Sequence, residues 1–440
     1  MLYRLGSGSL ASWDEAIYAT VAKEVVRSGH WLSFTLDGQL WFDKPPLAIW
    51  FTALLQKIFG VNELSSRLFS ALCGAGTVCV TYLFGRRLLN RWTAFIGALI
   101  LLSSSHFLRF ARFGMLDAPL TFFMTLAFFF FWLGHFKNRY LIFSGIAVGL
   151  AVLTKGFAAL LIFPVVWLFC LFSGRLDVLG RSSYWIGVIL AVAIALPWHL
   201  YELFSHPSPF LQDAVFKHLI LRTTTALDGH AGGWYFYLRV LVNKFHPWIL
   251  VAIFSAPFFL LRAVKDKEDE TIFLSVWIFF ILIALTAVRT KLAWYILPIY
   301  PALSLTAADF VARVFKESYA LYTKVMFLVI LALHVPYSNV FEQDYSRDIK
   351  GIAFAVLNAV PAEEPLFLYQ YHEAPAVSFY LSRVSRYADS REDFLKYAAQ
   401  GRFYCLIHAK ELEELTAGNP SRLGLVTLAS FENLRLVGRK

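Results

Sequence analysis

The sequence predicts a mainly α-helical, polytopic membrane protein with a small α/β domain at its C-terminal end. Its 440 residues are 58% hydrophobic, 17% aromatic and only 16% charged, and the mean hydropathy is +0.59. Soluble domains carry about 25% charged residues. Apolar stretches long enough to cross a bilayer recur along the chain. Beyond Pro336, shorter strand-like and helix-like runs alternate.

The apolar stretches place the membrane spans. Tyr140–Leu153 and Phe157–Phe172 are short and are separated only by Thr154-Lys155-Gly156, which favours a tight hairpin over a re-entrant pair. Leu47–Phe59 is too short to span and is expected to lie along the membrane interface. The expected spans are Ser65–Phe84, Thr93–Phe110, Leu116–His135, Tyr140–Leu153, Phe157–Phe172, Tyr184–Phe204, Pro247–Leu261, Ile272–Val288, Leu292–Phe310 and Leu321–Val335.

Basic residues lie mainly in short alternate loops between these spans. Cytoplasmic loops of membrane proteins are enriched in this way, so the net charge of +10 reports topology, and nucleic acid is not an expected partner. The opposite loops, including residues 1–64, 205–246 and the chain after Pro336, are then extracytoplasmic. The expected cytoplasmic set is Arg86, Arg87, Arg91, Lys137, Arg139, Arg175, Arg181, Arg262, Lys265, Lys267, Arg313 and Lys316.

We therefore expect three regions. Residues 1–64 form an extracytoplasmic loop, residues 65–336 a multi-spanning domain, and residues 337–440 an extracytoplasmic α/β domain. In the last region strands are expected at Leu366–Tyr369, Phe403–His408 and Leu423–Leu428, and helices at Arg347–Ala359, Arg391–Ala399 and Lys410–Ala417. The cysteines form no C-x-x-C motif, which argues against a disulfide framework or a thiolate metal site; they are Cys73, Cys79, Cys170 and Cys405.

Two polar clusters near the N-terminus are candidates for chemistry, because charges are rare in so apolar a chain. Asp14-Glu15 opens a short amphipathic helix, and Asp43-Lys44 precedes Pro45-Pro46. A carboxylate can take a proton from a reacting hydroxyl, and a cation can stabilise a developing negative charge. The structural alternatives are a helix N-terminus for the acidic pair and a weak surface ion pair for Asp43-Lys44.

Further charged residues lie at the expected outer ends of spans. Asp117 begins an apolar helix, where an unpaired carboxylate would be costly, and Arg112 is its expected partner. Lys155 lies in LTKGF, between two spans. The structural alternative for the cations is that they extend toward lipid headgroups.

Two later segments share this pattern. His230 precedes the aromatic run WYFY at residues 234–237, and Arg289, Lys291 and Tyr295 lie in RTKLAWYILP. A lone histidine is more often structural than a ligand, and the aromatic run is typical of an interfacial belt. Stacking of these rings on a sugar is the alternative.

Together these motifs resemble those of the integral-membrane glycosyltransferases that use polyprenyl-phosphate sugars (the GT-C type). That superfamily includes the bacterial lipid A aminoarabinose transferases and the protein O-mannosyltransferases. The resemblance runs through almost the whole chain. It rests on DE-x-x-Y at residues 14–18 and DKPP at residues 43–46, with support from R-x-x-x-x-D-A-P at 112–119, T-K-G at 154–156 and K-L-x-x-Y-x-L-P at 291–298.

The resemblance implies a GT-C helical bundle that transfers a sugar, with inversion, from a polyprenyl-phosphate donor to a lipid A-like, glycolipid or protein acceptor outside the cytoplasm. Asp43 stands where the aminoarabinose branch commonly has glutamate. The implied roles are a general base at Asp14 with Glu15 beside it; donor-phosphate ligands at Lys44, Lys155, Arg289, Lys291 and Tyr295; active-site support from Tyr18, Asp117 and Arg112; and candidate ligands of a divalent metal ion at Asp43 and His230.

Other hypotheses remain open at this point. Transporters tend to place polar residues near the midplane of repeated halves, whereas here the charges cluster at outer helix ends, which favours an enzyme over a flippase for lipid-linked sugar. An inactive relative is a third hypothesis. The family has a membrane helix just before the acidic pair, and residues 1–12 contain none. We expect one to be encoded upstream, with a truncated protein as the alternative.

Overall fold

A computed structural model gives the fold for residues 1–226, 229–314, 324, 328, 344–371, 374–383, 385–399, 401–416 and 423–439. The chain divides into two compact units. The first, which we call the helical unit, comprises Met1–Leu5, Phe42–Leu55 and Arg67–Phe341. The second, the α/β unit, comprises Gly6–Trp41, Gln56–Ser66 and Glu342–Lys440. The segment expected as one loop over residues 1–64 is therefore shared between both units.

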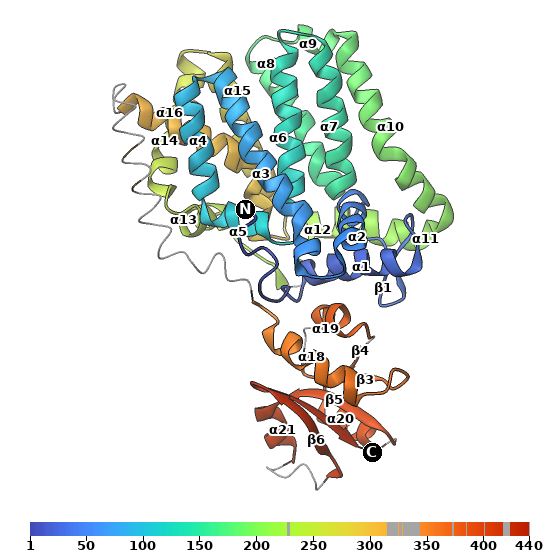
Figure 1. Cartoon of the computed structure of the whole chain (residues 1–440). Helices are drawn as coiled ribbons and strands as arrows, with labels where there is room; N and C mark the ends of the chain where they lie inside the picture. Colours follow the sequence, from blue (N-terminus) through green and yellow to red (C-terminus); the bar gives the residue numbers. More distant parts are fainter. Residues whose placement is uncertain are drawn as a thin grey trace. The chain divides into compact units, whose positions relative to one another are not determined.

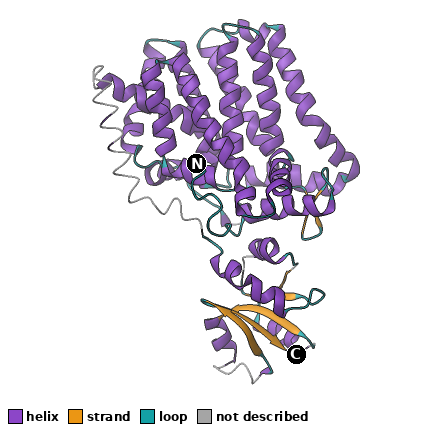
Figure 2. Cartoon of the chain, in the orientation of Figure 1, coloured by secondary structure: helices purple, strands orange, loops and turns teal. Residues whose placement is uncertain are grey.

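The helical unit consists of long helices joined by short connections, many of them running side by side (Figures 1 and 2). Its elements are most of α2 (Leu47–Phe59) and of α3 (Glu63–Leu88), α4 (Arg91–Ser103), α5 (Ser105–Arg112), α6 (Asp117–Gly134), α7 (Arg139–Lys155), the 3-10 segment η1 (Gly156–Leu161), α8 (Ile162–Phe172), α9 (Asp177–Gly180), α10 (Ser182–Ser205), α11 (Pro207–Phe210), the π-helical η2 (Leu211–Leu221), α12 (Arg222–Thr224), α13 (Phe236–Lys244), α14 (Ile249–Lys265), α15 (Asp269–Ala287), the 3-10 segment η4 (Ala293–Ile299) and α16 (Tyr300–Val314). The end of α2 and the start of α3, within Gln56–Ser66, belong to the α/β unit.

The described residues include six helical stretches that are long and apolar enough to cross a membrane, and seven if one bent pair is counted as a span. The chain is thus a multi-pass membrane protein. The expected span Pro247–Leu261 corresponds to α14, which has 17 residues and is not among the six. The expected span Leu321–Val335 lies outside the described residues apart from two positions. The six are Glu63–Leu88, Asp117–Gly134, Arg139–Phe172, Ser182–Ser205, Asp269–Ala287 and Ala293–Val314.

The expected span Thr93–Phe110 is broken rather than straight. α4 and α5 meet at an angle of 65°, and Ser104 between them has extended backbone angles. The hydroxyl of Ser103 donates to the carbonyl of Leu99 at 2.6 Å and accepts from the indole N–H of Trp248 at 2.9 Å. Serine side chains compete with the helical backbone for hydrogen bonds in this way, so consecutive serines end the first helix.

α7 and α8 form the expected hairpin through η1. The rings of His135, just beyond α6, and Phe169, near the end of α8, lie 5.3 Å apart, so α8 returns to the end of the bundle from which α7 starts. Gly156 makes the turn with a φ of +56°, a conformation that residues with a Cβ rarely adopt. The turn therefore explains the glycine of the T-K-G motif.

The long helix α6 connects two chemically different ends of the helical unit. Asp117 is its first residue, and at its other end the carbonyl of Gly134 accepts from Arg181 at 3.0 Å. Its 18 residues span about 27 Å. At the Gly134 end Arg175 pairs with Asp269 at 2.7 Å. Basic residues expected in cytoplasmic loops thus gather at the end away from Asp117.

The α/β unit is built on a five-stranded sheet in the order β4-β3-β5-β7-β6. β3 pairs in parallel with β4 and β5, and β7 pairs antiparallel with β5 and β6. The strands are β3 (Leu366–Tyr369), β4 (Ser385–Ala388), β5 (Phe403–His408), β6 (Val426–Phe431) and β7 (Leu434–Arg439), and the helices are α18 (Arg347–Ala359), α19 (Ala374–Leu381), α20 (Arg391–Ala399) and α21 (Ala409–Thr416).

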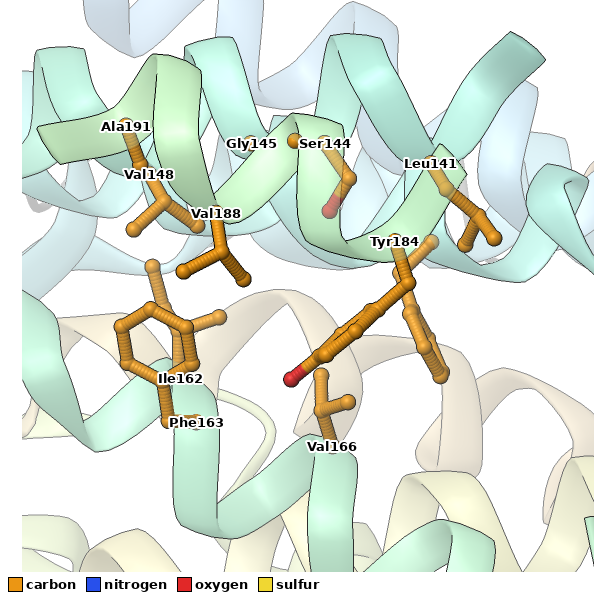
Figure 3. A pocket seen from close by; sticks show the side chains of 12 residues that line it. Leu141, Ser144, Gly145, Val148, Ile162, Phe163, Val166, Tyr184, Val188 and Ala191 are labelled. Carbon is orange, nitrogen blue, oxygen red and sulfur yellow. The ribbon is translucent and has the colours of Figure 1, made fainter. Parts of the chain in front are cut away.

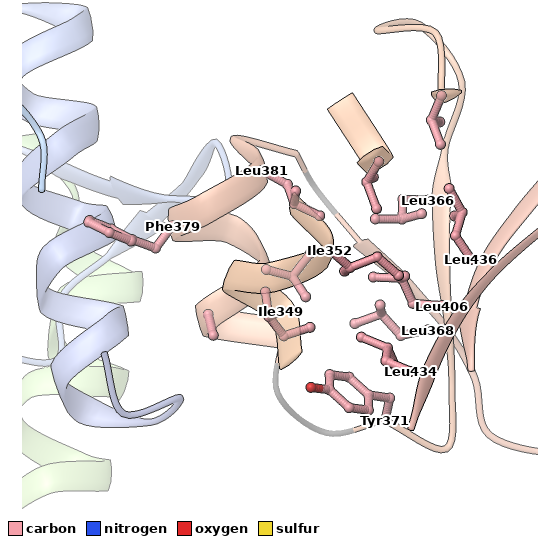
Figure 4. Packing of buried hydrophobic residues seen from close by; sticks show 14 of the residues in the cluster. Ile349, Ile352, Leu366, Leu368, Tyr371, Phe379, Leu381, Leu406, Leu434 and Leu436 are labelled. Carbon is pink, nitrogen blue, oxygen red and sulfur yellow. The ribbon is translucent and has the colours of Figure 1, made fainter. Parts of the chain in front are cut away.

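Helices cover both faces of this sheet. On one face Leu366, Leu368 and Leu406 pack with residues of α18 and α19 (Figure 4). On the other, Phe367, Cys405 and Ile407 pack with residues of α20 and α21. A strand that is buried on both faces has a nearly continuous apolar sequence. For this reason β3 and β5 were predictable. The predicted mainly helical fold with a small α/β domain is confirmed.

Near its N-terminus the chain adds one helix and one hairpin to the α/β unit. α1 (Asp14–Ser28) contacts the two-stranded hairpin of β1 (Phe34–Leu36) and β2 (Gln39–Trp41). Asp37 and Gly38 have φ values of +53° and +74°, as a tight hairpin turn requires. The Glu24 carboxylate of α1 accepts from the backbone N–H of Asp37 at 2.7 Å. This bond attaches the hairpin to α1.

Candidate active site

The helical unit contains a cavity of about 520 Å³, a size typical of small-molecule sites, which range over about 300–1,000 Å³. Leu120 and Met124 of α6, Leu196 and Leu203 of α10, and Leu285 of α15 form part of its apolar lining. Charged and hydroxyl groups join this lining: Asp43, Lys44, Asp117, Lys155, Arg222 and Tyr295. The cavity therefore offers an apolar wall together with three cations and two carboxylates.

Helix ends bring several of these polar residues into the cavity. Asp117 is the first residue of α6 and Lys155 the last of α7, where each charge suits the local end of its helix dipole. Arg222 begins α12, and Tyr295 lies in the 3-10 segment η4. Charged side chains placed at helix ends avoid the cost of ions within a span.

Asp117 and Lys155 form an ion pair at 2.5 Å, with side chains only 3% and 12% exposed. The Lys155 ammonium also lies 4.7 Å from the centroid of the Tyr295 ring, within the range of cation–π attraction. This ion pair joins Asp117 to a lysine 38 residues further along the chain; the pairing of Asp117 with Arg112 stays a prediction.

Tyr295 connects this pair to Arg222, whose guanidinium donates to the Tyr295 hydroxyl at 2.7 Å. Arg222 lies in a long loop with several other charged residues, and the sequence assigns it no role. The signal was weak because no motif surrounds Arg222. It is the structure that brings it to Tyr295, 73 positions away.

Lys44 lines the same cavity from the segment before α2. Its ammonium donates to the carbonyl of Asp43 at 2.9 Å. The carboxylate of Asp43 lies 3.7 Å from the ammonium of Lys217, and both side chains are substantially exposed, so this ion pair contributes little to stability. Lys44, Lys155 and Arg222 are thus contributed by three different parts of the helical unit.

Arg289, Lys291 and His230 are not among the residues that line the cavity. The Lys291 ammonium donates to the carbonyls of Thr286 at 2.7 Å and Val288 at 2.6 Å, at the end of α15. Burial, together with nearby Arg289, lowers the pKa of Lys291 below its usual value. The Lys291 backbone N–H donates to the carbonyl of His230 at 2.9 Å. In this arrangement Lys291 stabilises a helix end and its loop.

Arg112 is fully buried, and its guanidinium donates to the carbonyls of Met1 and Tyr3, each at 2.7 Å. These bonds hold the first residues of the chain against the end of α5. Arg112 therefore supports the fold of the helical unit at this point.

The acidic pair Asp14-Glu15 belongs to the α/β unit and begins α1. Glu15 is buried and accepts from the backbone N–H of Ala11 at 2.7 Å, so it stabilises the start of the helix. Asp14 is half-buried, and no described residue of its unit donates a hydrogen bond to its carboxylate. Tyr18, one turn further on, packs edge-on against Trp41, with ring centroids 6.1 Å apart.

A divalent metal ion was a candidate cofactor, with Asp43 and His230 as ligands. Among the described residues no three His, Cys, Asp or Glu side chains converge as a metal's ligand set. Asp43 forms an ion pair with Lys217. His230 is exposed and does not line the cavity. The described side chains do not fit a protein-made metal site.

A second cavity lies among α6, α7, α8 and α10 and is lined by apolar residues such as Val148, Ile162 and Val166, together with Tyr184 (Figure 3). Its volume is about 20 Å³, which is room for roughly one water molecule. It is a packing gap between helices rather than a ligand site.

A bundle of membrane-spanning helices around an apolar cavity that carries three cations defines a membrane protein suited to a lipid-linked anion. The family of dolichyl-phosphate-mannose-protein mannosyltransferases matches residues 43–201. An uncharacterised protein of Aquifex aeolicus is 32% identical over 434 residues, covering 96% of this chain and 81% of the relative.

Two relatives whose names state an activity are similar to this chain at nearly the same sequence identity as the Aquifex aeolicus protein. The undecaprenyl phosphate-alpha-4-amino-4-deoxy-L-arabinose arabinosyl transferase 2 of Pseudomonas fluorescens is 28% identical over 407 residues, covering 87% of this chain and 68% of that protein. The corresponding transferase of Pseudomonas savastanoi is 30% identical over 322 residues, covering 70% of this chain and 59% of that one. The chain thus spans 68% and 59% of the length of these two transferases.

Solved structures share the fold. ArnT from Cupriavidus metallidurans bound to undecaprenyl phosphate superposes with a TM-score of 0.80 at 20% identity, over 99% of this chain and 95% of that one. The oligosaccharyltransferase of Archaeoglobus fulgidus superposes with a TM-score of 0.61 at 13% identity, over 93% and 68%. In sequence and in fold, the chain is similar to integral-membrane glycosyltransferases that use polyprenyl-phosphate sugars, as its motifs indicated.

Proposed function

We propose that this protein transfers a sugar from a polyprenyl-phosphate donor to a lipid A-like, glycolipid or protein acceptor on the extracytoplasmic side of the inner membrane. The observation that carries the proposal is the cavity of the helical unit, where an apolar lining meets Lys44, Lys155 and Arg222. A polyprenyl tail needs an apolar environment, and its phosphate needs cations.

The cations have distinct roles in this proposal. Arg222 and Lys44 hold the donor phosphate, and Tyr295 orients the guanidinium of Arg222 through their 2.7 Å hydrogen bond. Lys155 adds positive charge and is itself held in place by Asp117. As the bond between the anomeric carbon and the phosphate oxygen breaks, negative charge grows on the phosphate, and these cations stabilise it. Polyprenyl phosphate is the leaving group.

Asp14 is the proposed general base. The acceptor hydroxyl attacks the anomeric carbon from the face opposite the phosphate, which inverts that carbon, and its proton passes to the Asp14 carboxylate. A base must be ionised and available, and no described group of its own unit occupies this carboxylate. We propose that Glu15, Tyr18 and Arg112 act by keeping the local structure, and that Arg289 and Lys291 keep the loop beside Arg222.

The charge distribution of the helical unit supports the proposed side of the membrane. Arg175 and Arg181 lie at the end of the bundle away from Asp117, and basic loops are typically cytoplasmic. Single cysteines at Arg175 and Thr225, in a background without the native cysteines, test this arrangement. A membrane-impermeant thiol reagent added to whole cells is expected to label position 225 and to spare position 175. The reverse pattern contradicts the proposed side.

The function itself is tested with purified protein in liposomes and a panel of polyprenyl-phosphate sugars, including aminoarabinose, mannose, glucose, galactose and galacturonic acid, with Asp14→Asn as the control variant. Consumption of one donor, lost in Asp14→Asn, supports the enzyme and identifies its sugar. The alternative function is a flippase. Movement of labelled lipid between leaflets without turnover of any donor would support a flippase and overturn the proposed sugar transferase.

A further inference from the structure

The helix that carries Asp14 is part of the core of the C-terminal α/β domain. Leu10, Ala16 and Ala19 are fully or almost fully buried in the same apolar cluster as Ile349 and Ile352 of α18. These residues are separated by more than 300 positions in the sequence. Figure 4 shows Ile349, Ile352 and Leu381 packed toward Leu366, Leu368 and Leu406 of the sheet. The α/β unit therefore holds α1 through a continuous apolar core.

Hydrogen bonds hold the segment just before Asp14 in place. The Asp344 carboxylate accepts from the backbone N–H of Ser9 at 2.8 Å and from its hydroxyl at 2.6 Å. The Ser9 hydroxyl in turn accepts from the backbone N–H of Ser346 at 2.7 Å. Next along the chain, the Leu10 N–H donates to the hydroxyl of Tyr380 at 2.8 Å. The segment that enters α1 is thus held by groups of the C-terminal domain.

A buried lysine holds α1 after Asp14. Lys23 is 7% exposed, and its ammonium donates to the carbonyls of Phe379 at 2.5 Å and Ser378 at 3.2 Å. These carbonyls belong to the last turn of α19, where a cation suits the negative end of the helix dipole. The ammonium also lies 5.5 Å from the centroid of the Phe379 ring. A buried charge is costly unless it is paired in such a way.

The face of α1 that these contacts hold is the one away from Asp14. Residues in a helix are rotated by about 100° from one to the next. Ala16, Ala19 and Lys23 therefore lie between about 140° and 200° from Asp14, on the opposite side. Tyr18, about 40° from Asp14, lies on the same side and packs on Trp41 of the hairpin. The contacts of Ala16, Ala19 and Lys23 with the domain thus lie on one face of α1, and Asp14 lies on the opposite face.

We propose that the C-terminal α/β domain is the positioning device for Asp14, and that Lys23 and Tyr380 are its positioning residues. The inference rests on the proposed function, in which Asp14 is the base. Neither residue touches the donor or the acceptor in this account. They act through the placement of α1, and a misplacement of about 1 Å in a reacting group can lower a rate by about a hundredfold.

Lys23→Met tests the proposal, because it removes the ammonium and keeps most of the aliphatic stem. We expect kcat for sugar transfer to fall about tenfold to a hundredfold, with the KM for the polyprenyl-phosphate donor unchanged. Tyr380→Phe removes the acceptor for the Leu10 N–H, and its kcat is expected to fall less, again at constant donor KM. Lys396→Met, the same change at an exposed position of α20, is the matched control and is expected to retain full activity.

The outcomes separate this inference from the proposed function. Suppose that Asp14→Asn abolishes transfer while Lys23→Met and Tyr380→Phe both keep the wild-type kcat. The positioning role of Lys23 and Tyr380 is then wrong, and the role of Asp14 as general base still stands. A rise in donor KM with unchanged kcat in these variants also overturns it. If wild-type protein consumes no donor, or Asp14→Asn is fully active, the proposed function fails first. Thermal unfolding in detergent checks that Lys23→Met is folded; if it is not, Tyr380→Phe decides.

Discussion

Asp14 and Asp117 each begin a helix, but they lie in different units and in different surroundings. Asp117 is almost completely buried and is paired with Lys155 at 2.5 Å in the lining of a cavity. Asp14 is half-buried, and no described group of its unit pairs with it. In the proposed mechanism, the same residue at the same helical position therefore serves two purposes. A carboxylate already bound to an ammonium orders a cation, whereas an unpaired carboxylate can accept a proton.

Substitution of Asp14 is expected to have the largest effect. Asp14→Asn removes the proposed base without changing its size, and general-base catalysis typically contributes about 10²–10⁴-fold. We expect kcat for sugar transfer to fall by that factor, while the melting temperature stays near that of the wild type because no described partner is lost. A steady-state transfer assay beside a thermal melt measures both. A variant that loses stability rather than turnover would remove the contrast with Asp117.

Asp117→Asn is expected to impair both stability and activity. Breaking a buried ion pair by removal of one partner costs about 3–5 kcal/mol, because the Lys155 ammonium is left buried beside a neutral amide. The melting temperature in detergent should therefore fall well below that of Asp14→Asn.

The double variant Asp117→Leu/Lys155→Met sharpens this contrast. Replacement of a whole buried pair by apolar residues is often neutral for stability, so its melting temperature should recover toward the wild type. Transfer should remain impaired, since the Lys155 charge is gone. Full recovery of transfer in the double variant would show that Lys155 has no role at the donor phosphate.

Arg222→Gln is expected to have a smaller effect, and on binding rather than on the base. Hydrogen bonds to charged groups contribute about 1.5–3 kcal/mol, which corresponds to a roughly tenfold to hundredfold weaker hold on the donor phosphate. The donor KM should rise accordingly. Lys217→Gln, which alters an exposed charge near Asp43, is the matched control. An equal rise in KM in both variants would indicate a general loss of positive charge, not a specific ligand.

A pH dependence of stability is the effect expected furthest from the transfer reaction itself. Burial is the main factor that lowers the pKa of Lys23, from 10.5 to about 8; nearby Arg27 lowers it further, while Glu24 and Asp37 oppose the shift. The unfolded chain then binds more protons than the folded one between these values, so this lysine makes the folded state more stable as pH rises from about 8 to about 10.5. The melting temperature of wild type relative to Lys23→Met, measured across that range, should rise with pH. A flat or falling difference contradicts the assigned burial of the charge.

Much of the fold was predictable because its elements satisfy local rules. Long apolar stretches fixed α3, α6, α10 and α15 to within a few residues. Arg347–Ala359 and Arg391–Ala399 were predicted with the boundaries that the structure shows. The edge strand β4 was missed, because its sequence SRYA has little of the apolar character that marks an interior strand. The Asp37-Gly38 hairpin was also missed, although its turn dipeptide is a recognised signal.

The candidate site was only partly predictable, because pairing between distant residues has no local signature. The sequence indicated Asp14, Lys44, Asp117, Lys155 and Tyr295 through motifs, but it gave no sign of the ion pair between Asp117 and Lys155. Arg222 lies in no motif, and it is the fold that brings it to Tyr295 and to the cavity. The division of the chain was not predictable either. The association of Gly6–Trp41 with Glu342–Lys440 depends on contacts such as Ser9–Asp344.

The central claim is that binding and chemistry reside in separate groups: the cations of the cavity bind the lipid phosphate, and Asp14 acts only on the acceptor. The most direct test is the equilibrium binding of free polyprenyl phosphate, the leaving group, to purified wild type, Asp14→Asn and Arg222→Gln in one detergent. We predict equal affinity for wild type and Asp14→Asn, with affinity for Arg222→Gln lower by about tenfold or more. Unchanged affinity in Arg222→Gln, or an equal loss in Asp14→Asn, would contradict it.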